Sequence, residues 1–118
     1  MNSVILDLLR KRRSIRKFQP QSVEREKIEA LVEAAVRTPT SRGRNPWEFI
    51  VVNDQKLLQK LGIAKQHGSA FLTNAPLAID VEADADKSDV CTEDCSIAAF
   101  VIQLTAEELG LGRCLVQV

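Results

Sequence analysis

The chain has little of what several protein classes require. Its 118 residues include no tyrosine, one tryptophan, one histidine (His67) and three cysteines. So few histidine and cysteine side chains make a metal site improbable. An odd number of cysteines without secreted-scaffold spacing also argues against a disulfide framework. We therefore expect Cys91 and Cys95, four residues apart, to be small buried apolar side chains.

Long apolar runs are missing as well. No stretch reaches the length of a membrane span, which excludes an integral membrane protein. The first apolar stretch is short and interrupted by Asp7, and basic residues follow it rather than precede it, unlike a secretory signal. With 45% hydrophobic and 27% charged residues, we expect residues 1–118 to form one domain in the cytoplasm, with no membrane partner.

The formal net charge is zero, but the charges are unevenly placed. Residues 1–44 hold 11 Lys or Arg and 5 Asp or Glu, a net of +6, whereas residues 80–108 hold 9 acids and only Lys87, a net of −8. Six positive charges lie in the ten residues LRKRRSIRKF, Leu9–Phe18, which we call the basic segment. Because this basic character is local and no aromatic residues interleave it, we expect no nucleic-acid partner.

Apolar periodicity predicts a mixture of helices and strands. Helices are expected at about Ser3–Arg12, from an N-cap at Ser22 to about Arg37, from Asp54 to Gly62, and at about Thr92–Leu109, with a further helical turn or two before Pro76. Strands are expected at Trp47–Val52, which reads as buried, at Pro76–Ala83 and in RCLVQV at 113–118. Without strict alternation, this order predicts an α+β fold with helices packed on a small sheet. The last helix is apolar around most of its circumference, so we expect it to be central.

The basic segment has two interpretations. After the first helix the chain should be extended, and alternate residues of an extended chain face the same way. Arg12, Ser14 and Arg16 would then place two guanidinium groups around a hydroxyl, which suits a phosphate. Alternatively, the segment is a solvated helix end whose arginines interact favourably with the helix dipole. Spacing alone leaves both open.

Four segments, taken together, resemble the nitroreductase family of FMN-dependent oxidoreductases. They are KRRSIRKF, TPTSRGRNPWEFIVV, FLTNAPLAI and EDCSIAAFVIQLTAEELGLGRC. Each is weak alone, but they follow the family's order and spacing over nearly the whole chain, from Leu9 to Cys114. The resemblance implies a nitroreductase-like fold, with a small central sheet flanked by helices and the long helix at the core of a homodimer.

The same resemblance implies which residues bind the cofactor. Arg12, Arg13 and Ser14 would serve the phosphate and ribityl side of FMN, and Arg16 would reach the pyrimidine edge of the flavin. The loop after the second helix would cap an FMN bound mainly by the other subunit, through Pro39, Thr40, Ser41 and Asn45. Several positions depart from the family pattern. Gly43 stands where Asn is frequent, Asn45 where Gln is frequent, and Arg113 where a small residue is common, and the strand LAIDVEA carries acids where apolar residues are usual.

The function implied is hydride transfer from NADH or NADPH, through the flavin, to nitroaromatics, quinones or similar small-molecule acceptors. No side chain is expected to act as a catalytic acid or base, since the protein's part is to place and tune the flavin. Family members continue well beyond this chain's last residue, so we expect the C-terminal part to be absent. Two alternatives stay open: another flavin reaction on this fold, such as dehalogenation, and a non-catalytic flavin-binding or dimerisation module.

Overall fold

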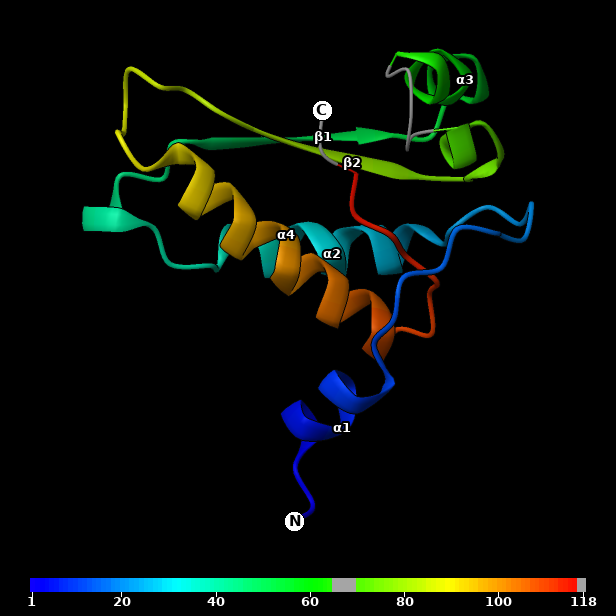
Figure 1. The fold of residues 1–118 in the computed structure, drawn as a ribbon, viewed down its shortest axis with the longest axis horizontal. Coiled ribbons are helices and arrows are strands. Elements are labelled where there is room, and N and C mark those ends of the chain that lie inside the picture. Colours follow the sequence, from blue (N-terminus) through cyan, green and yellow to red (C-terminus); the bar gives the residue numbers. More distant parts are fainter. Residues whose placement is uncertain (65–69, 117–118) are drawn as a thin grey trace.

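A computed structural model describes residues 1–64 and 70–116 (Figure 1). Their helices and strands are α1 (Val4–Lys11), α2 (Arg25–Val36), β1 (Trp47–Val52), α3 (Gln55–Ile63), β2 (Ala78–Ala83) and α4 (Cys91–Glu108), with 3₁₀ turns at Ser41–Gly43 and Ala70–Asn74. The α+β architecture is the one predicted. Among the described residues, no helix is long and apolar enough to cross a membrane.

Two helices begin at polar caps, and the cap at Asp54 is where the sequence predicts it. The Ser3 side chain accepts a hydrogen bond from the Leu6 N–H at 3.4 Å, and Asp54 accepts one from the Lys56 N–H at 2.8 Å. The prediction of Ser22 as the cap of α2 was wrong, because the helix begins after Glu24, whose backbone is still extended. A cap residue favours a helix start only where the chain turns, and here the turn comes two residues later.

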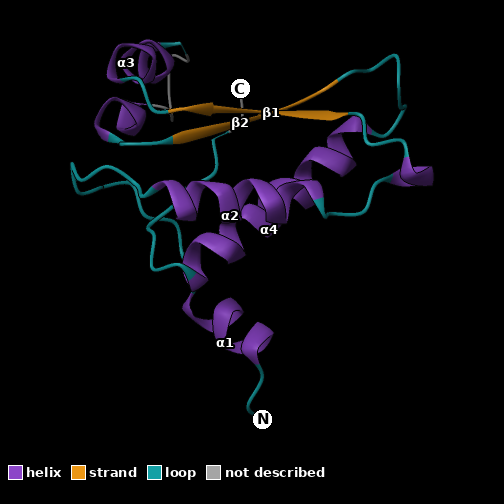
Figure 2. Ribbon diagram, turned by 180° about the vertical axis from the view of Figure 1, so that it is seen from behind, coloured by secondary structure: helices purple, strands orange, loops and turns teal. Residues whose placement is uncertain are grey.

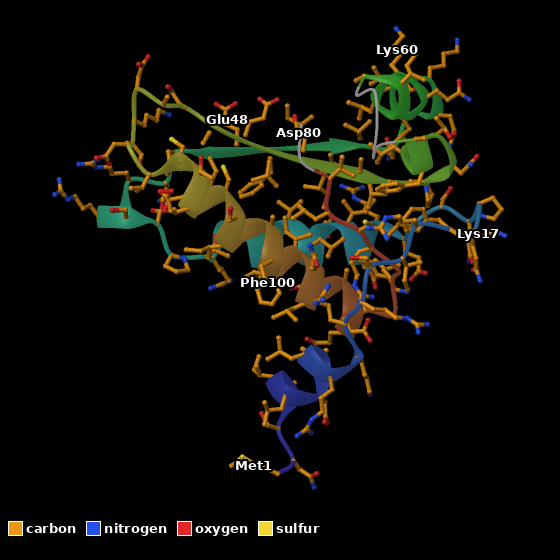
Figure 3. All side chains as sticks on the ribbon, viewed as in Figure 1. Met1, Lys17, Glu48, Lys60, Asp80 and Phe100 are labelled. Carbon is orange, nitrogen blue, oxygen red and sulfur yellow. The ribbon has the colours of Figure 1, made fainter. Side chains whose placement is uncertain are left out.

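The sheet has two antiparallel strands among the described residues, with Trp47 opposite Ala83 and Val52 opposite Ala78. Helices α2 and α4 lie against one face of this sheet, and α3 lies near one end on the other side (Figures 1 and 2). The prediction of a buried β1 was wrong: Glu48, Ile50 and Val51 are exposed. Glu48 and Ile50 share the face that α2 and α4 do not cover, so they reach solvent (Figure 3). Val51 points to the opposite face and is still 38% exposed, so the helices leave part of that face open as well.

The predicted third strand is not present over 113–116, and residues 117–118 lie outside the described residues. Residues 113–116 form no ladder with β1 or β2. One backbone hydrogen bond, from the Ile15 N–H to the Arg113 carbonyl at 2.9 Å, ties this stretch to the basic segment. β-Branched composition favours an extended chain, but a strand also needs a neighbouring strand for a hydrogen-bonded ladder.

Helix α4 lies in the middle of the arrangement and contacts α1, α2 and both strands. It is the longest helix, as predicted. The helix is central, as expected: its small residues Ala98 and Ala106 are buried, whereas Ile97 and Phe100 are each 42% exposed, so one side of it is uncovered in this single chain. Helix α1 projects from the body (Figure 1) and also has no buried residue. Apolar surface on both helices is therefore left uncovered.

Candidate functional site

The basic segment leaves α1 at Arg12, whose backbone is extended. Its middle residue, Ile15, faces the body of the protein. The Ile15 N–H donates to the Arg113 carbonyl, and a Cβ built on Gly112 would lie 3.3 Å from the Ile15 side chain. Because neighbours in an extended chain point to opposite sides, Ser14 and Arg16 face outward, and both are exposed.

Apart from Arg10, which pairs with Asp7 at 3.4 Å, the arginines of the basic segment have no carboxylate partner among the described residues. Arg12 donates only to a neutral amide, the Gln103 Oε1, at 3.4 Å. Within the described part of the chain, neither Arg12, Arg13 nor Arg16 forms an ion pair, whereas six other basic residues do: Arg10, Arg25, Lys27, Arg37, Arg44 and Arg113. Guanidinium groups that lack a carboxylate partner are available to an external anion.

Part of the segment borders a hollow of about 490 Å³. Its lining comprises Arg10, Lys11, Arg12, Arg13, Ile15, Glu107 and Arg113. Arg113 Nη1 lies 2.5 Å from Glu107 Oε2, and these side chains are 10% and 19% exposed. The structure thus brings Arg12 and Arg13 together at one hollow. Ser14 and Arg16 line neither this hollow nor the larger one described next, so they remain on open surface.

A larger, mostly apolar hollow of about 750 Å³ shares Ile15 and Arg113 with the first. Ile15, Lys17 and Phe18 contribute to it from the segment, and β2 and the C-terminal half of α4 contribute the opposite walls. The Phe18 and Phe71 rings meet at its edge with centroids 6.1 Å apart. The basic segment therefore borders both a cationic hollow and an apolar one.

The second predicted group lies in the loop Thr38–Pro46, which we call the α2–β1 loop. Thr40 Oγ1 accepts a hydrogen bond from the Asn45 N–H at 3.0 Å and donates to the Asn45 Oδ1 at 2.9 Å, which ties the two ends together. Within the loop, Arg42, Gly43 and Asn45 have positive φ angles of 57°, 62° and 48°. Pro39 and Ser41 are exposed.

A buried carboxylate fixes this loop to α4. The Ser41 N–H donates to Asp94 Oδ1 at 3.1 Å, and Asp94 is only 2% exposed. Its other oxygen, Oδ2, has no hydrogen-bond partner among the described residues. The sequence prediction missed this residue, since its sole signal was a place in the first turn of α4. Burying a carboxylate costs free energy that its hydrogen bonds must offset, and the Ser41 N–H supplies one such bond.

The structure does not bring the two predicted groups together within one chain. Arg12 meets α4 at Gln103 and Ser41 meets it at Asp94, nine residues away. At the helical rise per residue this is roughly 14 Å along the helix. In Figure 1 the basic segment, in blue, and the α2–β1 loop, in blue-green, lie toward opposite ends of α4.

Two titratable groups, Cys95 and Glu82, have pKa values above their ordinary ones. Burial raises the pKa of the Cys95 thiol, with smaller contributions from the charges of Cys91 and Asp94. All three cysteines are free and half-buried rather than fully buried. A hydrogen bond and repulsion from Asp80, followed by small effects of burial and of Glu48, raise the pKa of Glu82. Glu48 and Asp80 lie along the sheet face turned away from α4 (Figure 3).

The described residues contain no group of three or more His, Cys, Asp or Glu side chains placed to hold a metal ion. His67 lies outside the described residues.

Known proteins share both the sequence pattern and the fold. The family model described as "Nitroreductase family" matches residues 9–65, a range that includes the basic segment and the α2–β1 loop. A relative from Methanothermobacter thermautotrophicus, provisionally named an NADH dehydrogenase/NAD(P)H nitroreductase, is 38% identical over 111 residues. The match covers 92% of this chain and 58% of that relative, so the chain spans less than two thirds of its length.

Solved structures of similar proteins have the same fold. An FMN-dependent nitroreductase from Clostridium difficile R20291 superposes with a TM-score of 0.94 at 51% identity, covering 96% of this chain and 66% of the other. A protein from Bacteroides thetaiotaomicron, provisionally named an NADH dehydrogenase/NAD(P)H nitroreductase, gives a TM-score of 0.90 at 37% identity, covering 95% and 66%.

Proposed function

The chain belongs to the nitroreductase family, and we propose that it acts as an FMN-dependent oxidoreductase that uses NADH or NADPH to reduce nitroaromatics, quinones or similar acceptors. Two observations support the cofactor and the electron donor. One is the name of the Clostridium structure, which gives FMN, and the other is the name of the archaeal relative, which gives NADH and NAD(P)H. The acceptor class rests on the family resemblance alone.

The residues of the basic segment suit FMN. A phosphate carries two negative charges near neutral pH, and Arg12 and Arg13 offer guanidinium groups without a carboxylate partner among the described residues. The exposed hydroxyl of Ser14 adds a further donor. Arg16 would lie at the pyrimidine edge, where a positive charge favours the reduced cofactor. When bound, FMN supplies the hydride-transfer chemistry itself.

One observation carries the proposal: Arg12, Arg13 and Arg16 have no carboxylate partner among the described residues, and the backbone between them is anchored to the body of the protein at Ile15. Ile15 fixes it through the Arg113 carbonyl and the surface of Gly112. The arginines on either side are therefore presented by a fixed backbone rather than by a free tail. A preorganised set of donors binds an anion more tightly than a flexible one, because less conformational entropy is lost on binding.

We also propose that the protein is a homodimer. The exposed apolar side chains of α1 and α4, among them Val4, Ile5, Ile97 and Phe100, need a cover that this chain does not provide. A second copy placed on α4 would bury them. It would also give the α2–β1 loop a neighbouring FMN to meet, through Pro39, Thr40, Ser41 and Asn45.

The cofactor assignment is tested by changing both Arg12 and Arg16 to Ala in the full-length gene product. Two lost charge-assisted hydrogen bonds, each worth roughly 1.5–3 kcal/mol, predict at least about a hundredfold weaker FMN binding. The matched control is Arg25→Ala with Arg37→Ala, which removes the same charge from two exposed ion pairs on α2. We expect that control to change FMN affinity by less than about threefold.

The visible absorption spectrum and an NADPH oxidation assay give the readouts. Retention of stoichiometric FMN by the Arg12/Arg16 variant would show that the assignment is wrong. Wild-type protein that holds FMN but oxidises neither NADH nor NADPH would instead indicate a flavin-binding module without this activity.

A further inference from the structure

The α2–β1 loop has a conformation that its own sequence does not favour. Arg42 and Asn45 are not glycine, yet both have positive φ angles, and Gly43 lies between them with a third. A left-handed conformation costs a residue with a Cβ free energy that surrounding contacts must offset. The loop therefore depends on its anchors.

The two ends of the loop are held by Thr38, which donates to the Ala35 carbonyl, and by Pro46, whose carbonyl accepts from the Asp84 N–H. Three side-chain contacts hold residues 40–45 between those ends, and they differ in burial. The Thr40–Asn45 hydrogen bonds are exposed and join the loop only to itself. The ion pair between Arg44 and Asp89 is long, at 3.7 Å, and Asp89 is exposed. The contact from the Ser41 N–H to Asp94 Oδ1 differs, since the carboxylate is almost fully buried and belongs to α4. Of the three, it alone connects the loop to the central helix.

We propose that Asp94 is a positioning residue, which holds the α2–β1 loop in the conformation that contacts the partner subunit's FMN. The inference rests on the proposed function, because it assigns the loop that role. Asp94 itself is too buried to reach a ligand. It acts through Ser41, whose backbone it fixes one residue after Thr40 and four residues before Asn45.

Helix α4 gives this anchor a wider consequence. The same helix meets Arg12 through Gln103, so one rigid element sets the place of both the basic segment and the loop. In a dimer built on α4, the position of the loop relative to the neighbour's basic segment would follow from the helix packing. Loss of the Asp94 contact would release the loop without disturbing Arg12.

Three substitutions in the full-length gene product test the proposal. Asp94→Ala removes the acceptor of the Ser41 N–H. Asp94→Asn removes the charge and keeps Oδ1 as an acceptor, with an NH₂ group in place of Oδ2, the oxygen that has no partner among the described residues, so it should rescue the anchor. Glu93→Ala removes the same charge from the neighbouring, exposed position of α4. Glu93 does not touch the loop hydrogen bond, which makes it the matched control.

Trypsin gives a readout that needs no FMN. The loop contains two cleavage sites, after Arg42 and after Arg44, and the helix α2 contains Arg25. On FMN-free protein we expect Asp94→Ala to raise the initial cleavage rate after Arg42 and Arg44 by about tenfold or more, with no change after Arg25. Asp94→Asn and Glu93→Ala should stay within about threefold of wild type.

FMN affinity is the second readout. We expect Asp94→Ala to weaken binding by about tenfold, and Asp94→Asn to restore it to within about threefold. If Asp94→Ala is also cleaved rapidly after Arg25, general unfolding has replaced loop release. In that case we compare wild type with Asp94→Leu, because Leu fills the cavity that Ala would leave but supplies no acceptor for the Ser41 N–H.

The outcomes separate the two proposals. Wild-type cleavage rates in both Asp94→Ala and Asp94→Leu would overturn the anchor. Faster loop cleavage with unchanged FMN affinity would overturn the positioning role while leaving the FMN proposal intact. If wild-type protein binds no FMN, the proposed function fails and the positioning role fails with it, and the cleavage rates still show whether Asp94 holds the loop.

Discussion

Glu107 and Arg113 form a buried ion pair in the lining of the hollow that the basic segment borders. We expect removal of one partner to lower the free energy of unfolding. Arg113 donates from Nη1 to Glu107 and to the Leu111 carbonyl, while its Nε and Nη2 have no partner among the described residues. A guanidinium group cannot lose its proton in a protein. Replacing Glu107 by Leu therefore leaves a positive charge that is 90% buried without a counter-charge.

The magnitude follows from that burial. Breaking a buried pair from one side costs about 3–5 kcal/mol, and we expect the lower end because Glu107 is still 19% exposed. For a chain of 118 residues, an unfolding entropy of about 2.1 cal/mol/K per residue converts about 3 kcal/mol into a melting temperature lower by about 12 °C. The double variant Glu107→Leu/Arg113→Met removes both charges, so its stability should lie within about 1 kcal/mol of wild type.

Urea unfolding followed by circular dichroism measures these differences, at one protein concentration because dimerisation would add to the apparent stability. The matched control is Glu33→Leu. The Arg37 Nε–Glu33 Oε2 distance is 2.8 Å, but both side chains are more than half exposed. That loss should cost less than about 1 kcal/mol. A Glu107→Leu variant no less stable than Glu33→Leu, or a double variant no more stable than Glu107→Leu alone, would refute the reasoning.

Three further predictions concern assembly, pH and nucleic acid. Sedimentation equilibrium at low micromolar concentration should show a dimer of the full-length gene product, and Phe100→Asp should shift it toward monomer; a wild-type monomer that holds FMN and oxidises NADPH would contradict the dimer. The raised pKa of Glu82 means that its ionised form destabilises the fold, so Glu82→Gln should be more stable than wild type at pH 7, and this advantage should vanish below the ordinary pKa of 4.5. An equal advantage at both pH values would count against Asp80 and Glu48 as the cause. Fluorescence anisotropy should detect no binding to duplex DNA or single-stranded RNA at physiological salt; a micromolar, salt-sensitive complex lost on mutation of Arg12 and Arg13 would reverse that expectation.

Local sequence signals predicted most of the fold because its helices are set by nearby residues. The local pattern located all four helices, and Asp54 caps α3 as expected. The errors arose where structure depends on a distant partner. The stretch 113–116 has strand composition but no strand beside it. Burial of β1 was overestimated because composition does not reveal that α2 and α4 cover only one sheet face.

In the candidate site, too, features set by nearby residues could be predicted and contacts between distant residues could not. Charge density and family resemblance drew attention to the basic segment and the α2–β1 loop, both of which are continuous in sequence. The contacts that fix them are not. Arg12 and Gln103 are 91 residues apart in the chain, and Ser41 and Asp94 are 53 apart. A glutamine and an aspartate within a long helix carry no pattern that reveals such partners, so only the folded chain shows them.

The arrangement of α4 links these observations to assembly. A helix of an isolated soluble domain usually turns its large apolar residues inward. Here Ala98 and Ala106 face inward, which allows α2 and the sheet to approach closely, while Phe100 lies on the side of α4 away from the sheet (Figure 3). Large apolar side chains on an uncovered face favour a second protein surface there. The same helix holds the α2–β1 loop through Asp94 and the basic segment through Gln103. In a dimer packed on α4, the distance between the loop of one subunit and the basic segment of the other would therefore be set by how the two helices pack.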